Sequence, residues 1–71
     1  MAIPMHPVES SNISYIGYDY DTQELYITFT KGDTYKYDNV PEQVFKEFLE
    51  ASSVGKYYIN NIRGQYTSNK I

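Results

Sequence analysis

The run ELYITFT at residues 24–30 alternates apolar and polar side chains without interruption. Leu25, Ile27 and Phe29 share one face of an extended chain, which is the spacing expected of a strand buried on one side. Lys31-Gly32 follows, and glycine is free to take the positive φ that a tight hairpin turn often requires. The run is therefore predicted to be the middle strand of an antiparallel sheet.

Two further strands are predicted, one on either side of this run. Ile13–Tyr18 (ISYIGY) is rich in β-forming residues, and the residues between it and Glu24 (DYDTQ) contain Asp and Thr side chains that favour turns. Thr34–Tyr37 (TYKY) supplies the third strand. Consecutive strands joined by short turns predict an antiparallel meander.

An amphipathic helix is predicted directly after the sheet. Pro41 is suited to the first position of a helix, and Glu42 can pair with Lys46 one turn later. The residues of the apolar face are Val44, Phe45, Phe48 and Leu49. This face is predicted to cover the apolar side of the sheet, because both surfaces must leave water together.

A second, shorter helix is predicted to run from a cap at Ser52 or Ser53 to about Asn61, and Gly64 is suited to the turn that ends it. The predicted fold class is therefore α+β. It consists of a three-stranded antiparallel β-meander packed by one amphipathic helix and a second short helix, in the order β-β-β-α-α.

A chain of 71 residues without cysteine must build its core from aromatic and aliphatic side chains alone, so most of its nine tyrosines are expected to pack. One domain is predicted at residues 9–66, with flexible segments at 1–8 and 67–71. The sequence contains no signal-like or membrane-spanning apolar run, and a cytoplasmic location without membrane contact is expected.

The charges of the chain are unevenly distributed. The net charge of −3 argues against a general nucleic-acid-binding protein, which normally carries a basic excess. Acidic residues occupy positions between 9 and 50, whereas the rest of the last third, residues 51–71, contains only Lys56, Arg63 and Lys70 as charged residues. A cationic surface, if the protein has one, is expected in that last third.

Spaced segments over residues 8–66 carry a family resemblance. They are Ser10–Ile13 with Ile16–Tyr18; Leu25, Ile27 and Phe29 with Gly32; Tyr35 and Tyr37 with Val40-Pro41; and Ala51, Ser53, Gly55 and Tyr57 with Ile62-Arg63 and Tyr66. Together they resemble the KTSC domain, which is named after its occurrence at the C-terminus of some lysyl-tRNA synthetases. The resemblance implies a small bacterial or phage domain, for which RNA binding has been suggested.

Tyr35-Lys36-Tyr37 is the first candidate binding segment. The two tyrosines point to the same side of their predicted strand. Their rings can stack on unpaired bases, with Lys36 beside them, or they can fill the core between sheet and helices. The sequence favours the core, because a small domain without disulfides needs that ring area.

The second candidate is a basic-aromatic patch formed by Lys56, Tyr57, Arg63 and Tyr66. Arginine can grip a phosphate or stack on a base, and neighbouring tyrosines can add ring contacts. The alternative is that Arg63 forms an ion pair with Glu47 or Glu50 while the tyrosines cover the sheet. The sequence slightly favours this alternative over a ligand-binding patch, and both interpretations stay open.

The sequence gives little support to catalysis, and we expect a protein that is not an enzyme and needs no cofactor or metal. His6 lies between prolines, a poor position for a general base. Asp19, Asp21 and Glu24 resemble a calcium loop only loosely, because the glycine of that motif is missing. No glycine-rich phosphate loop is present.

Two functions remain for a small binding module. The first is RNA binding through the patch near the C-terminus. The second is protein interaction, with the chain as a phage-derived protein that binds and modulates a host enzyme; exposed tyrosines are common interface anchors. RNA binding is placed marginally first because of the family resemblance.

Overall fold

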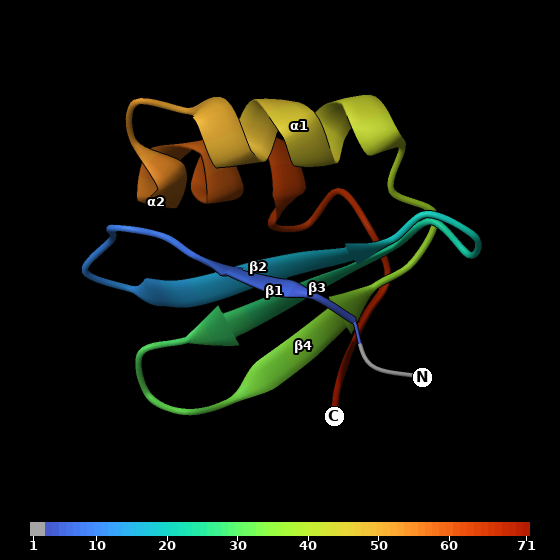
Figure 1. Cartoon of the computed structure of the whole chain (residues 1–71), viewed down its shortest axis with the longest axis horizontal. Coiled ribbons are helices and arrows are strands. Elements are labelled where there is room, and N and C mark those ends of the chain that lie inside the picture. The colour runs from blue at the N-terminus through green and yellow to red at the C-terminus, as the bar shows by residue number, and fades with distance from the viewer. Residues whose placement is uncertain (1–2) are drawn as a thin grey trace.

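Five antiparallel strands form one sheet in the computed structural model, which describes residues 3–71. The strands are β1 (Met5–Pro7), β2 (Ile13–Asp19), β3 (Glu24–Phe29), β4 (Thr34–Tyr37) and β5 (Ser68–Lys70). They lie side by side in sequence order, each antiparallel to its neighbour. The helices lie together on one side of the sheet, so the molecule has two layers and the other face of the sheet is open (Figure 1).

The predicted strand count was wrong, although the predicted meander is confirmed as β2, β3 and β4. Residues 5–7 and 68–70, which lie in the segments predicted to be flexible, form the two edge strands. Neither edge strand has an apolar period or strong β propensity. They form because an exposed neighbour offers backbone hydrogen bonds, a tertiary effect that sequence periodicity does not record. Residues 1–2 of the first predicted flexible segment lie outside the described residues.

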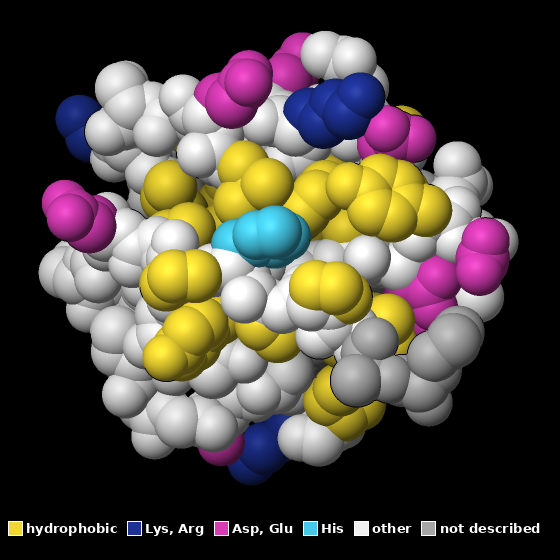
Figure 2. All heavy atoms as spheres, in the orientation of Figure 1, with side chains coloured by type: hydrophobic (Ala, Val, Ile, Leu, Met, Phe, Trp, Pro, Cys, Tyr) yellow, Lys and Arg dark blue, Asp and Glu magenta, His cyan; other side chains and the backbone are white. Residues whose placement is uncertain are grey.

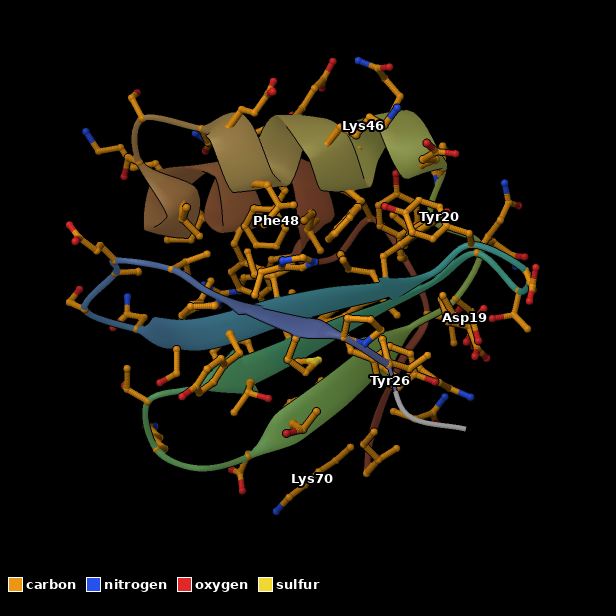
Figure 3. The ribbon with its side chains drawn as sticks, viewed as in Figure 1. Asp19, Tyr20, Tyr26, Lys46, Phe48 and Lys70 are labelled. Atoms are coloured by element: carbon orange, nitrogen blue, oxygen red, sulfur yellow. The ribbon has the colours of Figure 1, made fainter. Side chains whose placement is uncertain are left out.

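The predicted amphipathic helix is confirmed as α1 (Glu42–Glu50). Pro41 precedes it in an extended conformation, and the predicted pair of Lys46 with Glu42 is present at 3.0 Å. Phe45 and Phe48 are buried against the sheet, and Phe48 points from the helix toward the strands in Figure 3. Burial of these two rings fixes the helix on the sheet.

The second helix is divided into α2 (Val54–Tyr57) and a π-helical turn, η1 (Tyr58–Ile62). Of the two predicted caps, Ser53 is the one that the structure shows: its hydroxyl oxygen accepts the backbone N–H of Lys56 at 3.4 Å. At the other end the N–H of Arg63 donates to the carbonyl of Tyr58 at 2.8 Å. Gly64 then turns the chain with a φ of 76°.

The core lies between the sheet and the helices and includes two tyrosines. Its residues are Ile13, Ile16, Tyr18, Leu25, Ile27, Tyr37, Val40, Phe45, Phe48, Val54 and Ile62. The Tyr18 hydroxyl donates to the carbonyl of Val40, and the hydroxyls of Tyr37 and Tyr58 are 2.8 Å apart. Each buried ring therefore contributes apolar area while its hydroxyl stays hydrogen-bonded.

The structure predicts that the protein loses stability in alkali. Burial, together with a hydrogen bond to Glu47, raises the pKa of Tyr57 to about 12, and burial also raises the pKa values of Tyr37 and Tyr18. Unfolded tyrosine ionises near pH 10. Between about pH 10 and pH 12 the unfolded chain binds fewer protons than the folded one, so the free energy of unfolding must fall as pH rises.

This fall should appear in urea titrations at increasing pH, followed by circular dichroism. The variants Tyr37→Phe and Tyr57→Phe should show a shallower decline than the original chain, because phenylalanine cannot ionise. Constant stability through this pH range would contradict the prediction.

Candidate nucleic-acid interface

A groove of about 490 Å³ lies between the β3–β4 hairpin and the segment formed by α2 and η1. We call it the aromatic groove. The residues that matter most for its chemistry are Phe29, Lys31, Tyr35, Tyr58, Ile59 and Arg63. The groove therefore combines aromatic walls with two cationic side chains.

Three aromatic rings are packed against one another in the wall of the groove. The ring centre of Phe29 is 5.7 Å from that of Tyr35 and 5.5 Å from that of Tyr58, and both pairs are edge-to-face. The hydroxyl of Tyr58 is hydrogen-bonded to the hydroxyl of Tyr37 in the core. All three wall rings are only partly buried. The rings are thus held in fixed orientations while part of their surface faces solvent.

Arg63 is exposed and lines this groove. Within residues 3–71 its guanidinium forms no ion pair, so the alternative pairing with Glu47 or Glu50 is not found. Glu47 instead accepts hydrogen bonds from Tyr57 at 2.9 Å and from Gln43 at 3.2 Å. The guanidinium is therefore available to a ligand in the groove.

Lys31 is the second cation of the groove and lies in the turn between β3 and β4. Like Arg63, it forms no ion pair with the described part of the chain. The one acidic residue in the lining, Asp33, is paired with Lys70 at 3.4 Å. The local charge of the groove is consequently positive although the whole chain is acidic.

The tyrosines of β4 differ in accessibility. Tyr37 is only 4% exposed and belongs to the core, so its ring cannot serve as a stacking surface. Tyr35 points to the same side but lies at the groove and is partly exposed. Lys36 points to the open face of the sheet, where its ammonium is 3.1 Å from Glu24. Of this predicted segment, only Tyr35 presents a usable ring to the groove.

The predicted basic-aromatic patch is divided by the fold. Tyr57 faces α1, where its ring stacks on Phe48 at 5.4 Å and its hydroxyl donates to Glu47. Tyr66 packs against the core, and Lys56 lines a different pocket from Arg63. The π-helical turn and the turn at Gly64 separate these residues, so Arg63 alone of the four reaches the aromatic groove.

Lys56 lines the second pocket, which has a volume of about 280 Å³ and lies beside the aromatic groove. We call it the serine pocket, after Ser10, Ser11, Ser52 and Ser53. Both cavities are lined by Asn12, Gly55 and Ile59, so they share a wall. Two of the predicted cationic residues thus lie in adjoining cavities rather than in one patch.

Sequence reasoning missed Phe29, Lys31 and Tyr58 as groove residues. The alternation of β3 assigned Phe29 to the core, but this residue ends its strand and lies at the margin of the helical layer. Lys31 follows it in the turn. An apolar residue at the end of an alternating strand, next to a cation, is the sequence signal that could have indicated this site.

Polar side chains on the open face of the sheet contact one another. Tyr26 donates to Glu24 at 3.2 Å, and the hydroxyls of Thr28 and Thr34 are 2.9 Å apart. Hydrogen bonding from Lys36 lowers the pKa of the Glu24 carboxyl. These side chains are therefore hydrogen-bonded or ion-paired to one another.

In the turn between β2 and β3, the carboxylate of Asp19 has a structural role. A carboxylate oxygen of Asp19 accepts the backbone N–H groups of Asp21 at 3.0 Å and Thr22 at 3.4 Å.

Within residues 3–71 no helix has both the length and the apolar character needed to span a bilayer.

Comparison with known proteins connects this geometry to a family. The family model of the KTSC domain matches residues 9–66. A protein of Tsukamurella paurometabola is 48% identical over 58 residues, covering 82% of this chain and 85% of the relative. A lysine–tRNA ligase of Nostoc is 36% identical over 66 residues, which are 93% of this chain but 12% of the ligase.

The fold of the chain is also similar to a solved structure. The crystal structure of a KTSC domain protein from Yersinia pestis aligns with a TM-score of 0.93 and 41% sequence identity, and the alignment covers 99% of both chains. Sequence and fold therefore agree, and the chain belongs to the KTSC domain family.

Proposed function

We propose that the protein is a non-enzymatic module that binds single-stranded RNA in the aromatic groove. The observation that carries the proposal is the placement of Arg63, free of ion pairs within residues 3–71, beside the rings of Tyr35 and Tyr58. A planar guanidinium and fixed rings are the groups that unpaired bases and phosphates contact in known RNA-binding proteins.

The energies of base stacking and of phosphate neutralisation favour single-stranded over double-stranded nucleic acid as the ligand. Base stacking on an aromatic side chain contributes roughly 1–3 kcal/mol per base. Duplex binding depends more on neutralising many phosphates, and a chain with a net charge of −3 lacks that basic surface. A groove with two cations and three partly exposed rings suits one or two unpaired nucleotides.

Replacing Arg63 with alanine is expected to weaken binding of hexauridylate at least about tenfold at low salt, because a charge-assisted contact contributes about 1.5–3 kcal/mol. The slope of log K against log salt should also fall by about 0.7 for each lost phosphate contact. Fluorescence anisotropy of a labelled oligomer measures both quantities.

Lys46→Ala is the matched control for Arg63→Ala, since it removes one positive charge from the outer surface of α1, where Lys46 pairs with Glu42. An equal loss in both variants would assign the effect to net charge and contradict a specific site. Absence of binding by the original chain at low salt would overturn the proposal itself.

Binding of a protein partner is the alternative to RNA binding. Figure 2 shows apolar side chains gathered around His6, between the first strand and α1. Tyr20 is 58% exposed there and packs edge-on against Phe45 and Tyr18. A nuclease-resistant complex with a host protein, lost in Tyr20→Ser but kept in Arg63→Ala, would favour the interaction module over RNA.

A further inference from the structure

The serine pocket has the polar groups that bind a phosphate. The hydroxyl oxygen of Ser10 accepts the N–H of Asn12 at 3.3 Å, and that of Ser53 accepts the N–H of Lys56 at 3.4 Å. Both hydroxyls act as acceptors in these bonds, which leaves their own hydrogens free to donate. Ser52 adds an exposed hydroxyl. Phosphate oxygens are acceptors only, so they match these donors.

Lys56 supplies a positive charge to this pocket. It is exposed, and in the part of the chain that the structure describes it forms no ion pair. Glu9 also lines the pocket and opposes an anion there. The two charges offset each other, so a bound phosphate is held by hydroxyl donors and by a modest electrostatic contribution.

The position of the pocket indicates which phosphate it would bind. The serine pocket and the aromatic groove share Asn12, Gly55 and Ile59 in their walls. A strand with a base against Tyr35 and Tyr58 can therefore reach the serine pocket across this shared wall. That route leads to the hydroxyls of Ser10 and Ser53 and to the ammonium of Lys56.

We propose that the serine pocket binds a backbone phosphate of the strand whose base lies in the aromatic groove. This inference rests on the proposed function and makes the ligand a nucleotide step with its linking phosphate, rather than a single base. Lys56 and the serine hydroxyls contact the phosphate, and Glu9 weakens that contact.

The test measures hexauridylate binding as a function of salt in two variants with opposite expected effects. Lys56→Gln should weaken binding about threefold, typical of an exposed charge pair, and lower the salt slope by about 0.7. Glu9→Gln should strengthen binding by a similar factor. Lys46→Gln and Glu50→Gln make the same changes of net charge on α1 and should have smaller effects.

Nuclear magnetic resonance with inorganic phosphate alone separates the two possible sources of the anion. Under the proposal, hexauridylate shifts the amide signals of residues 52–56 together with those of the groove. If phosphate alone shifts residues 52–56 and the oligomer does not, the pocket is a free-phosphate site and the inference is overturned.

The remaining outcomes separate this inference from the proposed function. If the oligomer binds and Arg63→Ala weakens it, while Lys56→Gln and Glu9→Gln match their controls, the phosphate path is wrong and RNA binding in the groove stands. If the original chain binds no oligomer at low salt, both proposals are overturned.

Discussion

Replacing Phe48 with alanine is expected to destabilise the domain by about 3–5 kcal/mol, the usual cost of removing a buried phenylalanine ring. Phe48 is fully buried and joins α1 to the sheet, and its ring stacks on Tyr57. A domain of this size has a net stability of only a few kcal/mol. Urea titration should therefore find the variant largely unfolded without denaturant.

Phe48→Leu is the control for this prediction, because it keeps an apolar side chain and loses only part of the volume. We expect a folded protein with a lower urea midpoint and an unchanged slope. A cooperative transition in Phe48→Ala within about 1 kcal/mol of the original chain would show that α1 is not fixed by this ring.

Replacing Gly17 with valine is expected to release β1 from the sheet at a cost of about 1–3 kcal/mol, the range for inserting atoms into a packed site. A Cβ at this position would meet the Sδ atom of Met5, and it would lie 2.9 Å from the backbone carbonyl oxygen of Pro4. The flexible methionine can move aside, but a backbone carbonyl cannot move without shifting the strand.

Amide hydrogen exchange should show this release as loss of protection along the β1–β2 pairing, with β3 and β4 unchanged. Gly55→Ala is the matched control, because its Cβ would meet only Ser10 Oγ, at an ordinary 3.5 Å. That variant should keep its stability or gain up to about 1 kcal/mol from helix propensity. Retained protection in Gly17→Val would contradict the prediction.

The parts of the fold with a regular apolar period could be predicted from the sequence. The spacing of Leu25 and Ile27 is that of a strand, and the spacing of Phe45 and Phe48 is that of a helix. The structure confirms both elements, as β3 and α1. The edge strands could not be predicted in this way. Pro7 in β1 and the polar residues of β5 have no such period, and their pairing depends on the edges offered by β2 and β4.

The candidate site was less predictable than the fold, as the two tyrosines of β4 illustrate. Tyr35 and Tyr37 have the same orientation on the strand, yet only Tyr37 is covered by the helical layer. Their difference depends on where the second helix lies, which is a long-range property. The π-helical hydrogen bond from Arg63 to Tyr58, which helps to set the direction of Arg63, also has no marker in residue spacing.

The position of β5 has a consequence for how the chain reaches its native state. The strands from β1 to β4 are nearest neighbours in sequence, so their pairing requires only short loops to close. β5 instead pairs Ser68 with Tyr37, across the whole helical segment. Closing longer loops costs more entropy and slows folding. The pairing of β5 with β4 is therefore expected to form late, after the other strands and the helices have packed together.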